Sequence, residues 1–165
     1  HGSILARKEL PKNISLILFG KKNQIISEIK KHNFNEHEFE IVDCSEIIGM
    51  GEHPIKSLRL KKKSSINRGF QFLAQDKIDG YASAGNTGAM FVGGYYSVKA
   101  IQGILRPAIS TLIPREDGGV TVLLDVGANA DCKADVLYQF GFLGALFSKN
   151  VCNIKNPKVS LLNLW

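Results

Sequence analysis

The sequence is poor in cysteine and has no long apolar run. Its three cysteines form no CxxC pair, and an odd count argues against a disulfide framework. No apolar stretch approaches the roughly 18 residues that a membrane-spanning helix needs. The sequence also shows no signal-peptide pattern, internal repeat or low-complexity tract. We therefore expect a protein of the reducing cytoplasm.

Several binding motifs are missing too. No segment matches GxGxxG or GxxxxGK[ST], so the sequence predicts neither a dinucleotide fold nor a P-loop. The four histidines have no metal-binding spacing, and there is no aromatic signature of RNA binding. The formal net charge of +6 favours acidic partners such as phosphorylated metabolites, an acidic protein or an anionic surface. It does not by itself indicate nucleic acid.

What is present is typical of one globular α/β domain. Of the 165 residues, 44% are hydrophobic and 22% are charged, and such a chain can bury a core without disulfides. Short apolar runs alternate with helical patterns, which predicts a mostly parallel sheet covered on both faces. We expect strands at Ile14–Phe19, Phe39–Val42, Gly80–Ser83, Pro107–Ile113, Val120–Leu124 and Val159–Leu162. We expect helices at Asn23–Lys31, Ile55–Leu60, Ile66–Ala74, Asn86–Ile101 and Ala134–Ser148, and an antiparallel hairpin turn at Pro114–Gly119.

The segment Ser83–Ala89 predicts a turn from a strand into a helix. Gly85 and Gly88 let backbone N–H groups approach a ligand, and the helix N-terminus carries about half a positive charge. These features suit a phosphate or an oxyanion, held with Ser83, Asn86 or Thr87. An equally weighted alternative is that Asn86 only caps the helix and the glycines only ease packing.

The segment Asp125–Lys133 follows another predicted strand. Here Asp125 could orient a partner, Asn129 could donate to an oxyanion, and Asp131 could move a proton. The alternative is that Asp125 forms an Asx turn and Asp131 caps the next helix. We expect Cys132 to be structural rather than a nucleophile, because no histidine lies nearby in the sequence.

A basic stretch precedes one predicted helix. Ser64 and Ser65 stand where a helix N-cap belongs. The stretch could bind phosphate or an acidic protein, although such charge runs are more often solvated faces. Its basic residues are Lys56, Arg59, Lys61, Lys62 and Lys63.

Read together, these segments resemble the bacterial phosphate acyltransferases of phospholipid synthesis (PlsX). The longest matching strings are SAGNTGA at residues 83–89 and LLDVGANADC at residues 123–132. Shorter ones are IVDCSEII (41–48), PIKSLR (54–59), KKSS (62–65), GILRPA (103–108) and IKNPKV (154–159). The resemblance covers nearly the whole chain.

The resemblance implies an enzyme that transfers an acyl group from acyl carrier protein to inorganic phosphate, giving acyl phosphate. It implies a three-layer α/β/α fold similar to isocitrate and isopropylmalate dehydrogenases. It also implies a cytoplasmic homodimer that associates peripherally with the membrane and needs no metal or organic cofactor. A remoter similarity to phosphate acetyltransferases makes Asp131 the proton-handling candidate, with Asn129 and Asp125 as further catalytic candidates.

The other site residues follow from the same picture. We expect phosphate or the oxyanion to be bound by Ser83, Gly85, Asn86, Thr87, Gly88, Lys63, Ser64 and Ser65. We expect Arg59, Lys61 and Lys62 to face phosphate or the carrier protein.

The match is incomplete. The family begins with a strand carrying an aspartate and paired glycines, and it continues past the final strand with a glycine and glutamates. We therefore expect residues 1–165 to be a single α/β domain from a longer enzyme, without the first strand and the C-terminal half. Such a fragment can be inactive by itself. Two alternatives stay open: a short-chain phosphate acetyl- or butyryltransferase that uses coenzyme A, and a non-catalytic module that binds an acidic partner.

Overall fold

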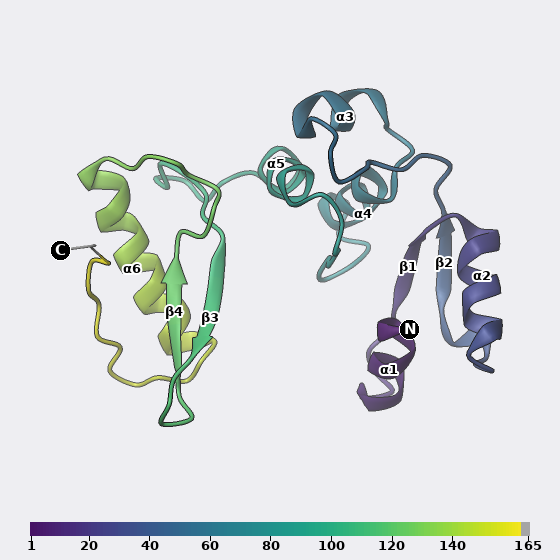
Figure 1. The fold of residues 1–165 in the computed structure, drawn as a ribbon, viewed down its shortest axis with the longest axis horizontal. Coiled ribbons are helices and arrows are strands. Elements are labelled where there is room, and N and C mark those ends of the chain that lie inside the picture. The colour runs from purple at the N-terminus through teal and green to yellow at the C-terminus, as the bar shows by residue number, and fades with distance from the viewer. Residues whose placement is uncertain (163–165) are drawn as a thin grey trace. The chain divides into compact units, whose positions relative to one another are not determined.

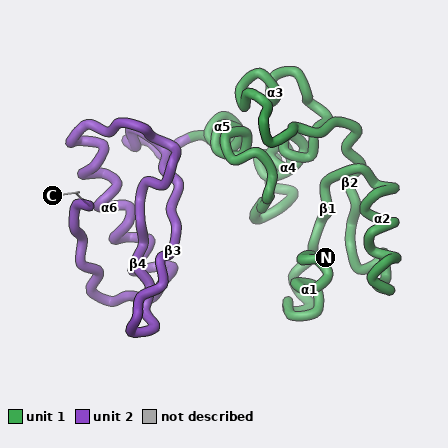
Figure 2. The backbone as a smooth tube through the Cα atoms, in the orientation of Figure 1, with its two compact units in different colours: residues 1–99 green, residues 100–165 purple. Residues whose placement is uncertain are grey.

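The structure is a computed structural model that describes residues 1–162. Figure 1 shows a mixed α/β chain, which confirms the predicted α/β class. It divides into two compact units, His1–Lys99 and Ala100–Trp165 (Figure 2). The single-domain organisation and the dehydrogenase-like classification stay predictions.

The first unit contains a β–α–β element. Strands β1 (Ile17–Gly20) and β2 (Glu40–Asp43) pair in parallel, joined through α2 (Lys22–Lys31) and the short 3-10 helix η1 (Glu36–Glu38). Helix α1 (Gly2–Glu9) precedes them. A parallel pair needs such a crossover because both strands run in the same direction. Apolar side chains from these elements form one core, built on Ile4, Ile29 and Phe39.

One edge of β1 has no neighbouring strand in the described residues. The N–H of Glu40 donates to the carbonyl of Leu16 (3.3 Å), and the N–H of Cys44 donates to Gly20 (2.9 Å). The backbone N–H and C=O groups of successive strand residues point to opposite edges of the strand. Those of Ile17 and Phe19 therefore point to the edge of β1 that faces away from β2. That edge is unpaired within residues 1–162.

Three helices form the rest of the first unit: α3 (Pro54–Leu60), α4 (Ser65–Ala74) and α5 (Thr87–Val98). Their buried side chains form a second core that includes Leu58, Ile66, Phe70 and Ala89. Helix α5 begins as predicted but ends at Val98, because Lys99 has φ +64° and leaves the helical region. The close contact between α3 and α5 requires a glycine, because a Cβ on Gly88 would lie 2.5 Å from Cγ of Pro54.

The second unit is a hairpin with one long helix. Strands β3 (Ser110–Pro114) and β4 (Val120–Leu124) pair antiparallel, and α6 (Ala134–Asn150) packs on β4. The predicted hairpin is confirmed. Its turn is closed by the N–H of Arg115, which donates to the carbonyl of Gly119 (2.8 Å). Gly118 has φ +79°, a conformation that favours glycine.

Two predicted strands are wrong within the described residues. Gly80–Ser83 pairs with no other strand. A segment whose backbone makes no hydrogen bonds to a neighbouring strand is not a β-strand, even when that backbone is extended. Val159–Leu162 is likewise irregular. The apolar segment expected to form this last strand extends to Trp165, so it lies partly outside the described residues. Strand β1 is also shorter than predicted, since it begins at Ile17 rather than Ile14.

Candidate functional site

The N-terminus of α5 lies in the SAGNTGA segment. Asn86 is the N-cap, and its Oδ1 accepts from the N–H of Ala89 at 2.9 Å. The N–H of Gly85 donates to Oγ of Ser83 at 3.0 Å. The N–H groups of Thr87 and Gly88 make no hydrogen bond within residues 1–162. These two donors, beside the positive end of the helix dipole, are what a bound anion requires.

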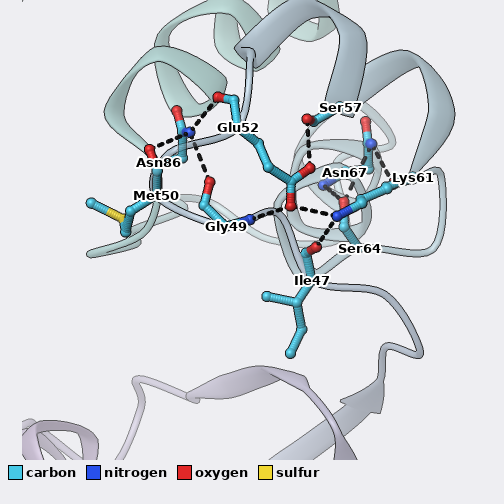
Figure 3. A network of polar contacts seen from close by, with 9 residues as sticks. All are labelled: Ile47, Gly49, Met50, Glu52, Ser57, Lys61, Ser64, Asn67 and Asn86. Carbon is cyan, nitrogen blue, oxygen red and sulfur yellow. Dashed lines mark hydrogen bonds and ion pairs between the residues drawn. The ribbon is translucent and has the colours of Figure 1, made fainter.

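The Asn86 side chain does more than cap the helix. It is 4% exposed, and its Nδ2 donates to the carbonyls of Gly49 (3.0 Å), Met50 (3.1 Å) and Glu52 (3.0 Å). Figure 3 shows these contacts converging on one amide group. Asn86 therefore caps α5, as the alternative predicted, and it also holds the 49–52 loop. Since all of its polar atoms are engaged, any contact with a ligand at this turn would come from the neighbouring backbone.

Glu52 is the centre of the same network and was missed by the sequence analysis. Its carboxylate accepts from the N–H of Gly49 (2.8 Å), from Oγ of Ser57 (2.8 Å) and from Nζ of Lys61 (2.5 Å). The hydrogen bond from Lys61, followed by those from Gly49 and Ser57, lowers the pKa of Glu52 to about 2. Together Glu52 and Asn86 fix the loop at residues 49–52 to α3 and to the start of α5 (Figure 3).

This network predicts a defined pH dependence of stability. A carboxyl with a lowered pKa stabilises the fold above its unfolded pKa, near 4.3, and the stabilisation is lost as pH falls through the folded pKa. We expect the unfolding midpoint of Glu52→Gln to be lower than that of the wild type at pH 7. The difference should shrink below about pH 4.3 and disappear near pH 2, the folded pKa of Glu52. Thermal unfolding monitored by circular dichroism checks this, and a constant difference down to pH 2 would contradict it.

In the basic stretch, some side chains make hydrogen bonds or ion pairs and others are exposed without them. Lys61 is engaged, because its ammonium also donates to the carbonyl of Ile47 at 2.7 Å besides the Glu52 pair. Arg59 and Lys62 are exposed, and neither forms an ion pair within the described residues. Their predicted role toward phosphate or a carrier protein stays a prediction, and Lys61 is the least available of the three.

Ser64 and Ser65 begin α4 as predicted. Ser64 is the N-cap and is fully buried, and its Oγ accepts from the N–H of Asn67 at 3.4 Å. Ser65 is half-buried, and its carbonyl accepts from the hydroxyl of Tyr81 at 3.1 Å. Burial raises the pKa of Tyr81 to about 12. The backbone N–H of Lys63 donates to Glu46 (2.7 Å). Phosphate binding by this helix start stays a prediction, and for Ser64 it would require the buried hydroxyl to become exposed.

In the second unit, Asp125 organises the loop that follows β4. One carboxylate oxygen accepts from the N–H of Ile109 (2.7 Å), and the other accepts from the N–H groups of Ala128 (2.9 Å) and Asn129 (2.7 Å). Burial alone would raise the pKa of Asp125, but these hydrogen bonds outweigh it and the pKa is lowered. The carboxylate therefore holds the turn, as the structural alternative predicted.

Asn129 and Asp131 differ in how they are held. Nδ2 of Asn129 donates to the carbonyl of Pro107 at 2.9 Å. Asp131 is exposed, and only its backbone carbonyl has a partner, Nη1 of Arg106 at 2.9 Å. Its carboxylate has no hydrogen bond or ion pair within residues 1–162. The prediction that Asp131 caps α6 is wrong, because the N-cap is Lys133. The Asp131 carboxylate is thus free to contact a ligand, and its catalytic role stays a prediction.

The described residues contain no cluster of three or more His, Cys, Asp or Glu side chains that could hold a metal. Their cysteines, Cys44, Cys132 and Cys152, are free thiols. Across residues 1–162, no helix combines the length and the apolar character that spanning a membrane demands.

Comparisons with known proteins extend over almost the whole chain. Residues 1–164 match the family described as "Fatty acid synthesis protein". A phosphate acyltransferase of Dictyoglomus turgidum is 42% identical over 163 residues, which are 99% of this chain and 48% of that protein. One of Halothermothrix orenii is 43% identical over 152 residues, 92% of this chain and 45% of that protein. One of Clostridium tetani is 37% identical over 153 residues, 93% of this chain and 46% of that protein.

The chain therefore spans about half the length of the curated relatives it matches. The SAGNTGA and LLDVGANADC segments lie inside the matched region, so the resemblance indicated by these motifs is confirmed. The chain belongs to the fatty acid synthesis protein family.

Proposed function

We propose that the whole protein containing this chain transfers an acyl group from acyl carrier protein to inorganic phosphate. The observation that carries the proposal is family membership, together with relatives named phosphate acyltransferase. The products are an acyl phosphate, which serves phospholipid synthesis, and the free carrier thiol.

The proposed acyl transfer needs groups that bind phosphate, stabilise an oxyanion and transfer a proton. A phosphate oxygen attacks the thioester carbonyl carbon, a tetrahedral oxyanion forms, and the C–S bond then breaks to release a thiolate that takes up a proton. Phosphate must be freed of water and aimed, which the N–H groups of Thr87 and Gly88 support. The family resemblance, rather than any placement of the two units, assigns oxyanion donation to Asn129 and proton transfer to Asp131. Asp125 acts as a positioning residue, because it holds the backbone of Asn129.

The remaining expectations from the resemblance belong to the same proposal. The whole protein is a cytoplasmic homodimer that associates peripherally with the membrane and uses no organic cofactor or metal. Its fold is a three-layer α/β/α sandwich similar to isocitrate and isopropylmalate dehydrogenases, and residues 1–165 are a single α/β domain from that longer enzyme. The unpaired edge of β1 supports a wider sheet, since a free edge offers backbone donors and acceptors to a further strand.

The test is an assay of the whole protein with acyl-carrier-protein thioester and phosphate. We expect phosphate-dependent loss of the thioester with formation of one acyl phosphate per thiol released. Faster turnover of acetyl- or butyryl-coenzyme A would favour the short-chain acyltransferase instead. Carrier-protein binding without any phosphate-dependent thioester loss would favour the non-catalytic module.

A further inference from the structure

A groove lies in the first unit between α3 and α5. It encloses about 260 Å³, and Asn67 of α4 also lines it. Helix α3 contributes Ile55, Leu58 and Arg59, at the i, i+3 and i+4 spacing that puts side chains on one helical face. Lys62, in the turn after the helix, also lines the groove. The opposite wall comes from Val92 and Tyr96 of α5, one turn apart.

The walls of this groove expose apolar surface. Ile55 is 53% exposed and Tyr96 is 70% exposed, while Leu58 beneath them is buried. Leu60, on the same segment of α3, is 66% exposed. Grouped apolar side chains on a concave surface are typical of a binding site for another molecule, whereas single exposed ones are not.

The charge around the groove has one sign. Arg59 and Lys62 line it, Lys56 is exposed on the same helix, and none of the lining residues is acidic. The one ion pair of this basic segment within the described residues joins Lys61 to Glu52. It leaves the charges of Arg59 and Lys62 uncompensated, so the groove favours an acidic ligand with an apolar face.

We propose that this groove docks an acidic, amphipathic helix of the acyl carrier protein. An apolar side chain of that helix inserts between Ile55 and Tyr96, and its carboxylates face Arg59 and Lys62. Laying the apolar face of a helix into a groove between two helices is an established mode of recognition. A concave, narrow groove fits a helix better than the flat surface of an anionic membrane. The proposal rests on the proposed function, because that function supplies the acidic partner.

The experiment measures carrier-protein binding and turnover in the whole protein. The variants are the double charge reversal Arg59→Glu/Lys62→Glu and the truncation Tyr96→Ala. The matched control is Lys12→Glu, an exposed lysine in the same unit that does not line the groove. Binding is measured by fluorescence anisotropy of labelled acyl carrier protein, and by flotation with vesicles of anionic phospholipid. Turnover is measured with acyl-carrier-protein and with acyl-coenzyme A, which lacks the protein partner.

We expect the double reversal to weaken carrier-protein binding on the order of 100-fold and Tyr96→Ala about tenfold. The kcat/KM for acyl-carrier-protein should fall in parallel. The KM for phosphate, the turnover of acyl-coenzyme A and all properties of Lys12→Glu should stay unchanged. Unchanged carrier binding in both groove variants overturns the proposal, as does loss of vesicle binding alone.

The same experiment separates this proposal from the proposed function. If the wild type binds the carrier protein through these residues but shows no phosphate-dependent thioester loss, the groove assignment stands and the acyltransferase proposal fails. If the wild type is active and the groove variants bind and turn over the carrier like the wild type, the acyltransferase proposal stands and the groove assignment fails.

Discussion

Asp131→Ala in the whole protein is expected to lower the rate of acyl phosphate formation about 10²- to 10⁴-fold, the range typical for loss of a general acid or base. The unfolding midpoint should not fall, because the carboxylate is exposed and makes no hydrogen bond or ion pair within the described residues. The measurement is the initial rate of phosphate-dependent thioester loss, compared with urea unfolding of the same preparations.

Asp125→Ala is the informative comparison, since the two carboxylates lie in one loop and have different surroundings. Removing Asp125 leaves the N–H groups of Ile109, Ala128 and Asn129 without their acceptor. We expect a loss of roughly 3 kcal/mol in the free energy of unfolding, as for hydrogen bonds to a charged group. Wild-type turnover in Asp131→Ala, or a loss of stability as large as that of Asp125→Ala, would contradict the assignment of roles.

Asn86→Ala is expected to destabilise the protein by about 2 to 3 kcal/mol. The loss of the N-cap accounts for about 1 kcal/mol. The rest comes from the carbonyls of Gly49, Met50 and Glu52, which lose their amide donor. Urea unfolding of the whole protein measures this, and activity should fall as well because the start of α5 loses its attachment to the 49–52 loop.

Asn86→Ser separates the two contributions of that side chain. Serine caps a helix but is too short to reach three carbonyls, so we expect about half the loss of stability seen with alanine. Asn23→Ala, an exposed position on α2, is the matched control and should change stability by less than about 0.5 kcal/mol. Equal losses of stability in Asn86→Ala and Asn86→Ser would mean that capping adds nothing. Wild-type stability of Asn86→Ala would contradict the hydrogen-bond network.

Local patterns predicted most of the helices and the hairpin. Periodic apolar residues located α4 and α6 to within two residues, and Ser64 marked the start of α4. The polar turn before Gly119 located the β3–β4 pair. The strand at Gly80–Ser83 was wrong for a reason that local sequence cannot reveal. A strand exists only with a neighbour to pair with, and none is present in the described residues.

The candidate site shows the same limit. The SAGNTGA string indicated an anion-binding turn, but nothing in it indicated that the Asn86 amide would reach residues 34 to 37 positions earlier in the chain. Glu52 lies in a polar segment with no motif, and its importance appears only when Ser57 and Lys61 are brought to it by α3. The sequence indicated that Asp125 forms a turn, whereas the exposure of the Asp131 carboxylate could be seen only in the structure.

The central claim is that the backbone at the start of α5 binds phosphate, and Thr87→Pro tests it most directly. Thr87 is the first residue of α5, where proline fits a helix and removes only an N–H that has no partner in the helix. The preceding Asn86 has φ −54° and ψ 110°, outside the α region that a following proline disfavours. Thr87→Ala is the control, because it keeps the N–H and removes the hydroxyl.

The quantity to measure is the KM for phosphate in the whole protein. One hydrogen bond to a charged group is worth about 1.5 to 3 kcal/mol, so we predict a rise of at least tenfold in Thr87→Pro. We predict less than a threefold rise in Thr87→Ala and a similar unfolding midpoint in both variants. A KM for phosphate that is unchanged in a folded, active Thr87→Pro enzyme would contradict phosphate binding at this turn.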